Sequence, residues 1–162
     1  MNLNEFFENL ASNASRNYKI EQLKKNSDNE NLKEVVRLAL DPFTQFYQRK
    51  IPKYTPNTSD HAASLQSMLP ALNDLSDRVV TGNAAIDRLT SILEAAGEQD
   101  AKVIERIIQK DLKCGVQVST VNAVWKNLVY EYPVMLCSPF EQKLVDKIKF
   151  PAYVQLKMDG MR

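Results

Sequence analysis

The chemically richest stretch of the sequence is KMDGMR at residues 157–162, which holds Lys157, Asp159, Gly160 and Arg162. A lysine amine attacks phosphorus only when neutral, so a nucleophilic lysine needs burial or a nearby positive charge to lower its pKa. Gly160 permits a tight turn or a close approach of backbone to ligand, and the planar fork of Arg162 suits phosphate or ribose oxygens. These residue types could therefore serve attack on a phosphate, although an exposed Asp-Gly hairpin turn is the alternative.

The residues just before Lys157 show the alternation of a β-strand, with Tyr153 and Gln155 on the same face as the lysine. From residue 130 onward the helical periodicity stops, and prolines interrupt an extended apolar segment. We therefore expect a mainly α fold with a boundary after residue 131. An all-helical domain over 1–131 would be followed, over 132–162, by the first strands of an α/β domain.

The first 130 residues show the periodicity and capping signals of short helices. Ser15 is expected to cap a helix that stops near Asn26, and Asp28 or Asn29 to cap a helix through residue 40. Asp41-Pro42 predicts a fresh helix start over 43–50, and a proline-containing loop follows at 51–60. Ser67, preferred to Ser64 because Pro70 follows, is expected to cap the next helix.

Two further helices have clear apolar faces. One is expected to begin at Gly82 and Asn83 and to stop at a left-handed Gly97. Asp100 is expected to cap the next helix, which Gly115 ends. Its buried face would consist of Val103, Ile104, Ile107, Ile108 and Leu112. After the turn, Ser119 would cap a helix over 120–128.

Composition excludes several classes of protein. With 44% hydrophobic and 25% charged residues the chain is typical of a soluble globular protein, and no apolar run approaches the roughly 18 residues of a membrane span. The N-terminus does not resemble a secretory signal, so an intracellular location is expected. Cys114 and Cys137 are expected to be reduced thiols, His61 a surface residue, and no metal-ligating cluster is predicted. The net charge of +1 means that any nucleic-acid binding must use local patches and backbone groups.

The segment KMDGMR matches the Lys-x-Asp-Gly-x-Arg signature of nucleotidyltransferases, which include ATP-dependent DNA ligases, RNA ligases and mRNA capping enzymes. Together with TGNAAIDRL, IQKDLKCGVQVSTVNAVW and FPAYVQLKMDGMR, in this order and spacing, it makes the chain resemble the N-terminal part of ATP-dependent DNA ligases of the T-even bacteriophage type. RNA ligases and capping enzymes are the weaker alternative, because they lack a helical unit in front of the signature.

This resemblance implies roles for the terminal residues. Lys157 would be the nucleophile that takes AMP from ATP, with release of pyrophosphate. Gln155 would contact adenine, Asp159 and Gly160 would shape the loop around the sugar, and Arg162 would bind the nucleotide. In the complete enzyme, with Mg²⁺, AMP would pass to the 5′-phosphate at a nick in double-stranded DNA and the 3′-hydroxyl would then seal the strand.

The resemblance also implies that the helical domain binds the DNA backbone along the minor groove. Helix starts with free N–H groups can hold phosphates without net positive charge and without reading the bases. The residues expected to contact DNA are Gly82, Asn83, Lys110, Lys113, Gly115, Ser119, Thr120 and Lys126.

The later motifs of the resembled enzymes have no counterpart in these residues, so the 162-residue chain by itself is expected to be inactive in adenylation. Two interpretations follow: a portion of a ligase, acting as a monomer in the cytoplasm of a bacterial host, or a stand-alone DNA-binding module derived from one. The coding sequence beyond Arg162 would discriminate between them.

Overall fold

The computed structural model describes residues 1–48, 50–131 and 139–153. These residues are mainly helical and contain no β-strand, which confirms the helical part of the predicted fold. Lys157 and Gln155, on which the predicted strand depends, lie outside the described residues. The chain divides into two compact units, Met1–Glu131 and Tyr132–Arg162.

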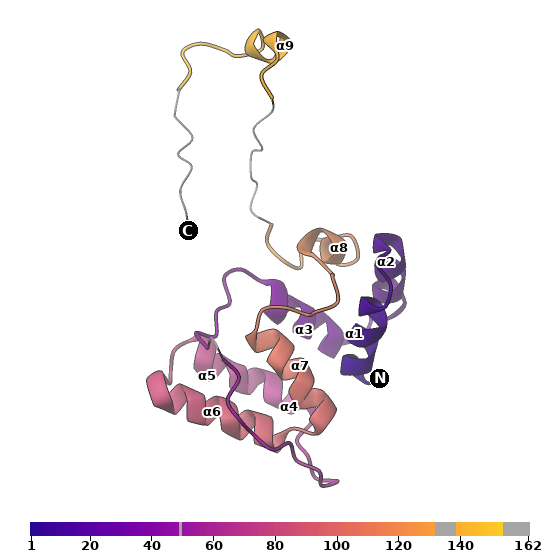
Figure 1. Cartoon of the computed structure of the whole chain (residues 1–162), viewed down its shortest axis with the longest axis vertical. Helices are drawn as coiled ribbons and strands as arrows, with labels where there is room; N and C mark the ends of the chain where they lie inside the picture. Colours follow the sequence, from indigo (N-terminus) through magenta and orange to yellow (C-terminus); the bar gives the residue numbers. More distant parts are fainter. Residues whose placement is uncertain (49, 132–138, 154–162) are drawn as a thin grey trace. The chain divides into compact units, whose positions relative to one another are not determined.

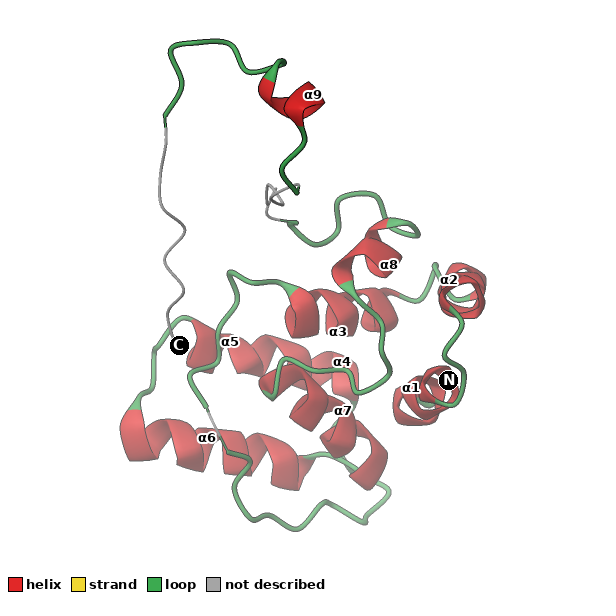
Figure 2. Ribbon diagram, turned by 45° about the horizontal axis from the view of Figure 1, so that its top comes forward, coloured by secondary structure: helices red, strands yellow, loops and turns green. Residues whose placement is uncertain are grey.

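The first unit is built from short helices and one longer one, joined by turns and by a long loop between α3 and α4 (Figures 1 and 2). In chain order they are α1 (Leu3–Ala11), α2 (Arg16–Lys25), α3 (Glu30–Leu40), α4 (Leu65–Met68), the 3-10 helix η1 (Leu69–Leu72), α5 (Asn73–Ser76), α6 (Gly82–Ala95), α7 (Glu98–Ile108) and α8 (Val118–Asn122). Within the described residues of the second unit there is one helix, α9 (Gln142–Val145), and none of its residues is buried. No helix in the described parts of the chain has the length and apolar character needed to span a bilayer.

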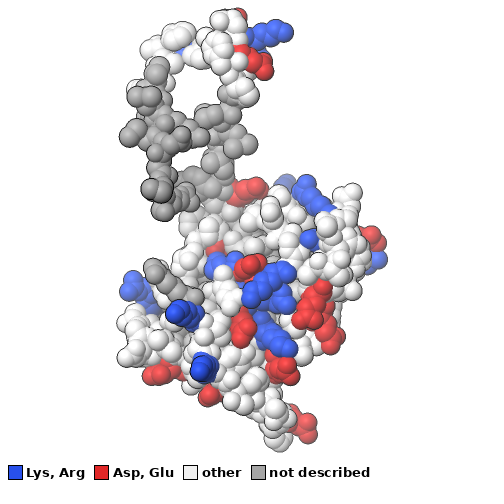
Figure 3. Space-filling model, in the orientation of Figure 1, with Lys and Arg blue, Asp and Glu red and all other residues white. Residues whose placement is uncertain are grey.

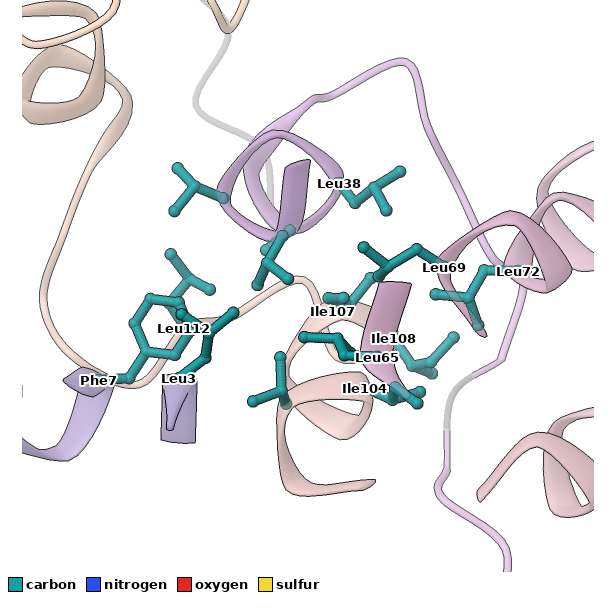
Figure 4. Packing of buried hydrophobic residues seen from close by; sticks show 14 of the residues in the cluster. Leu3, Phe7, Leu38, Leu65, Leu69, Leu72, Ile104, Ile107, Ile108 and Leu112 are labelled. Atoms are coloured by element: carbon teal, nitrogen blue, oxygen red, sulfur yellow. The ribbon is translucent and has the colours of Figure 1, made fainter. Parts of the chain in front are cut away.

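Helix α7 is central to the first unit, because α1, α3 and α6 all pack against it. Its apolar face meets leucines of the surrounding helices and Phe7 of α1 in one continuous core (Figure 4). All five residues predicted to be buried are buried, although Leu112 lies after the end of α7: Val103, Ile104, Ile107, Ile108 and Leu112. Each fully buried side chain of this size contributes roughly 1.5–3 kcal/mol to stability.

The predicted caps of the second and third helices are confirmed. The Ser15 hydroxyl accepts a hydrogen bond from the Tyr18 N–H at 3.4 Å, and Asn26 is the C-cap of α2. The Asn29 side chain accepts from the Leu32 N–H at 3.0 Å and begins α3. Both caps satisfy amide groups that the first helical turn leaves without partners.

The helix predicted over 43–50 is wrong for the described residues of that segment. Asp41 does behave as a cap, since its carboxylate accepts hydrogen bonds from the Phe43 N–H and the Thr44 hydroxyl, but only a single turn follows. Phe46 then enters the core, and Tyr47 adopts a positive φ of 55° that no α-helix accommodates. Burial of one aromatic side chain therefore overrides a local helix-start signal. The loop predicted over 51–60 is confirmed.

The cap of the fourth helix is Ser64 rather than the predicted Ser67, whose N–H donates to the Ser64 hydroxyl at 3.4 Å. The prediction assumed one continuous α-helix, in which Pro70 had to fall within the first turn. The chain instead changes to the 3-10 helix η1 at Leu69. Pro70 is the second residue of η1, where the helix requires no backbone N–H donor.

The junction between α6 and α7 also differs from the prediction. Gly97 has φ −64° and ψ 156°, so it is extended rather than left-handed, and it is the N-cap of α7. Asp100 consequently lies in the first turn of α7 instead of capping it. The Asn57 N–H donates to the Ala96 carbonyl at 2.8 Å, so the long loop runs beside this junction and fixes its extended conformation.

The end of α7 was predicted seven residues too late. The helix ends at Ile108, because Lys110 and Lys113 both adopt positive φ values, and Gly115, at φ 64°, ends the turn rather than the helix. The cap of α8 is Gln117, so Ser119 lies inside the first turn. This helix is also shorter than predicted.

Arg106 joins α7 to α1 and to the turn that follows α7. Its guanidinium donates to the Leu112 carbonyl and, at 3.1 Å, to the Asn4 side chain, and it lies 5.9 Å from the Phe7 ring centroid. The Arg106 side chain is only 12% exposed. It is therefore a buried polar connection between elements distant in sequence.

Cys114 is a buried free thiol whose pKa is raised by burial, as expected for a structural cysteine, and His61 is exposed. Cys137 lies outside the described residues.

Candidate nucleic-acid interface

The residues predicted to handle the nucleotide, Lys157, Gln155, Asp159, Gly160 and Arg162, lie outside the described residues. Their roles remain predictions. Among the residues that the structure does describe, no group of three or more His, Cys, Asp or Glu side chains could hold a metal ion. The described residues that were predicted to contact DNA lie in loops and at helix starts.

The start of α6 is open to solvent. Thr81 precedes it without a side-chain hydrogen bond to the first turn, and Gly82 and Asn83 are both exposed. A Cβ added at Gly82 would meet nothing within 4 Å. The first-turn N–H groups of this 14-residue helix thus have room for an anion, to which the helix dipole adds attraction.

Arg78 and Tyr47 lie beside this helix start and were not among the predicted residues. Together with Gly82 they line a pocket of about 180 Å³. The Arg78 guanidinium lies 4.9 Å from the Tyr47 ring centroid, and both residues have positive φ. Such cation–π contacts hold a guanidinium in place while its donors remain available. Only the folded loops bring these two residues together, so no local pattern in the sequence indicates the pair.

The Lys110 ammonium forms hydrogen bonds within the protein. Its ammonium donates to the carbonyl of Leu38 at 2.7 Å and to that of Asp41 at 2.6 Å, at the C-terminal end of α3. Burial lowers the pKa of Lys110 to about 8, although the charge of Asp41 acts in the opposite direction. The geometry therefore assigns this lysine to closing the C-terminal end of α3.

Lys113 and Lys126 are exposed, and neither ammonium forms an ion pair within the described parts of the chain. The Lys113 N–H donates to the Asp111 carboxylate at 2.8 Å, which stabilises the left-handed backbone of the turn. Both side chains are available to a phosphate but are not held in a fixed geometry.

The remaining predicted residues, Gly115, Ser119 and Thr120, do lie together. They line a pocket of about 290 Å³ with Ala14, Arg16, Lys19 and Gln117. Arg16 and Lys19 come from α2, which packs against α8, and sequence reasoning missed both. Their spacing of three residues places them on one helix face, but only the packing of α2 on α8 brings them to this turn.

Basic and acidic side chains are interspersed over the face of the first unit seen in Figure 3. The first unit therefore has no broad positive field on this face, in keeping with the net charge of +1 for the chain. An anionic polymer would therefore have to be held at particular points, such as the start of α6 and the pocket at Gly115 beside α8.

No protein-family profile matches the chain. It is 40% identical over 158 residues to the DNA ligase of Enterobacteria phage T4 and, with the same figures, to the DNA ligase of Enterobacteria phage T6. Each match covers 94% of this chain and 32% of the relative, so the chain spans about a third of the length of these curated relatives. Two solved structures, Pmar-Lig_PreS3 and Pmar-Lig_Pre, superpose on 76% of this chain and 29% of theirs, with TM-scores of 0.66 and 0.68 at 26% identity.

Proposed function

We propose that this chain, which is homologous to the bacteriophage T4 and T6 DNA ligases over 94% of its length, is part of an ATP-dependent DNA ligase whose helical unit binds the DNA backbone. The observation that carries the proposal is the 40% sequence identity over 158 residues. The similarity to the two solved structures supports the same relationship at the level of the fold.

The open start of α6 supports backbone binding by the helical unit. An anion placed there would meet free N–H groups and the positive end of a helix dipole. Arg78, held against Tyr47, would add a charge-assisted hydrogen bond to the same phosphate or to the next one along the strand. Contacts of this kind position a protein on DNA without reading sequence, as sealing of arbitrary nicks requires.

The nucleotide chemistry is proposed from the Lys-x-Asp-Gly-x-Arg residues. Lys157 would accept AMP from ATP with release of pyrophosphate, Gln155 would contact adenine, and Arg162 would bind the nucleotide. Asp159 and Gly160 would shape the loop around the sugar, at the end of a strand of an α/β domain that begins near residue 132. Mg²⁺, when bound, would offset the phosphate charge. The substrate would be nicked double-stranded DNA.

The 162-residue chain should bind duplex DNA weakly at low salt and independently of base sequence. Fluorescence anisotropy with labelled duplexes of several sequences, nicked and intact, would measure this. We expect similar affinities for all sequences and a steep loss of affinity as salt is raised, because phosphate contacts release counterions. Absence of binding at high micromolar protein in low salt would contradict the proposal.

The exchange Asn83→Asp tests the α6 start specifically. A carboxylate at the second position of this helix should repel a phosphate and lower DNA affinity, while its interaction with the helix dipole leaves folding intact. Asn31→Asp is the matched control, because Asn31 occupies the same position in α3. If both variants bind DNA equally well, the start of α6 is not part of the interface.

A further inference from the structure

Lys19 is a buried residue whose ammonium has no hydrogen-bond or ion-pair partner among the described residues. The residue as a whole is only 7% exposed. Lysine is almost never buried unless it is paired, because removing its charge from water costs free energy that a partner must offset. The buried stem of Lys19 therefore holds its ammonium in a nearly fixed position, where its donors remain available to a ligand.

The ammonium of Lys19 reaches the pocket beneath Gly115. Within the described residues no fully buried side-chain nitrogen or oxygen lacks a hydrogen-bond partner, so the Lys19 Nζ must retain contact with solvent. A Cβ added at Gly115 would lie 2.7 Å from that nitrogen, which places the ammonium directly against the glycine in the pocket wall. A ligand can therefore reach the Lys19 ammonium through this pocket.

The other residues around the pocket suit an anion. Arg16 lies at the edge, where its guanidinium donates to the Ser119 carbonyl at 3.4 Å. Gln117 and Ser119 bring an amide and a hydroxyl, both able to donate hydrogen bonds. No carboxylate is found among the lining residues that the structure describes. A volume of about 290 Å³ is several times the roughly 30 Å³ share of one water molecule, which leaves room for a phosphate and its attached oxygens.

We propose that this pocket binds one phosphodiester group of the DNA backbone, with Lys19 as the central cation and Arg16 at the rim. The inference rests on the proposed function and adds a specific binding site to it. A phosphodiester is the occupant favoured by the site, because it brings the anionic oxygens that the ammonium, guanidinium, amide and hydroxyl can all bind. Free phosphate and the triphosphate of ATP share this chemistry, so the test includes them.

The variant Lys19→Met removes the charge and keeps most of the apolar stem. We expect duplex affinity to fall about tenfold, since one hydrogen-bonded ion pair is lost. The slope of log affinity against log salt should become shallower by about 0.9, the value for one phosphate contact. Lys24→Met is the matched control: Lys24 lies on the same helix, is exposed, and undergoes the same charge change. Its affinity should stay within about twofold of the wild type.

Thermal unfolding separates binding from a structural role. If Lys19 serves a ligand, Lys19→Met should raise the melting temperature by about 2–4 °C, because the variant removes a charge that folding takes largely out of water without giving it a protein partner. A lower melting temperature accompanied by a proportional loss of binding would overturn the proposal and make Lys19 structural. Arg16→Gln, at the rim, should reduce affinity and salt slope without a stability change, and an unaltered slope there would also count against the pocket.

The source of the phosphate is tested by titrating the wild type and Lys19→Met with inorganic phosphate and with ATP at constant ionic strength. The proposal expects neither to bind measurably below millimolar concentration. If the variant loses affinity for free phosphate or ATP but not for DNA, the pocket serves a different anion and the proposal fails. Wild-type protein that does not bind DNA at all would overturn the proposed function itself. Wild-type binding that Lys19→Met leaves unchanged would overturn only this site.

Discussion

Replacing Arg106 with alanine should destabilise the helical unit by about 2–5 kcal/mol, because two acceptors lose their donor at about 1–3 kcal/mol each. The substitution leaves the Leu112 carbonyl and the Asn4 side-chain oxygen without their donor, and it exposes a gap beside the Phe7 ring. Urea denaturation followed by circular dichroism would measure the loss as a lower midpoint with an unchanged slope.

Arg88→Ala is the control for this prediction. Arg88 pairs with the Asp74 carboxylate at 2.8 Å, but its side chain is 41% exposed, so its removal should cost less than about 1 kcal/mol. Equal losses for the two variants would show that the buried network around Arg106 contributes no more than a surface pair.

Since Leu112 leads directly into the turn at Gly115, the Arg106 variant should also lose DNA affinity.

The second large effect concerns adenylation. The 162-residue chain, incubated with labelled ATP and Mg²⁺, should form no covalent lysyl-AMP, whereas the complete DNA ligase of phage T4 would serve as the positive control. A lysine with an ordinary pKa of about 10.4 is almost wholly protonated at neutral pH, and lowering that pKa requires surrounding structure. The chain spans only 32% of the length of its relatives, so we expect that surrounding structure to come from the part it does not share.

A labelled band from the 162-residue chain that disappears in the Lys157→Ala variant would contradict this prediction. It would show that the residues present are enough to activate the amine. A band that survives Lys157→Ala would instead place the label on another residue and leave the assignment of Lys157 wrong.

Local signals predicted much of the helical fold, because a cap and the amides that it binds lie within three residues. Ser15 and Asn29 are examples, and the buried face of α7 follows from spacing alone. The same reasoning failed at Asp41, where the local cap exists but the burial of Phe46 redirects the chain after one turn. It also failed at Gly97, whose extended conformation is tied to pairing of the neighbouring Ala96 with the long loop.

The candidate interface was predicted in part. Gly115, Ser119 and Thr120 do line one pocket, and Gly82 does open a helix, since glycine and capping patterns mark turns in the sequence. Lys19 could not be identified in this way. Its spacing of four residues from Leu23 places it on the same helix face, but only the packing of α2 against α8 shows that Lys19 is buried while Lys24 stays in solvent.

Lys110 has a structural role that its place in the sequence did not indicate. Its place in a turn between helices suggested a phosphate contact, but the ammonium is used by two carbonyls of the chain itself. A lysine in a turn can therefore be a helix-closing residue as readily as a ligand-binding one, and only the positions of the acceptors decide between these roles.

The proposed binding of DNA through the start of α6 and the pocket at Gly115 can be tested by an amide chemical-shift titration of the 162-residue chain with duplex DNA. We expect the largest shifts on two groups of amides, those of Gly82 and Asn83 and those of residues 115–120. Saturable shifts that leave both groups unchanged and fall on other parts of the chain would contradict it.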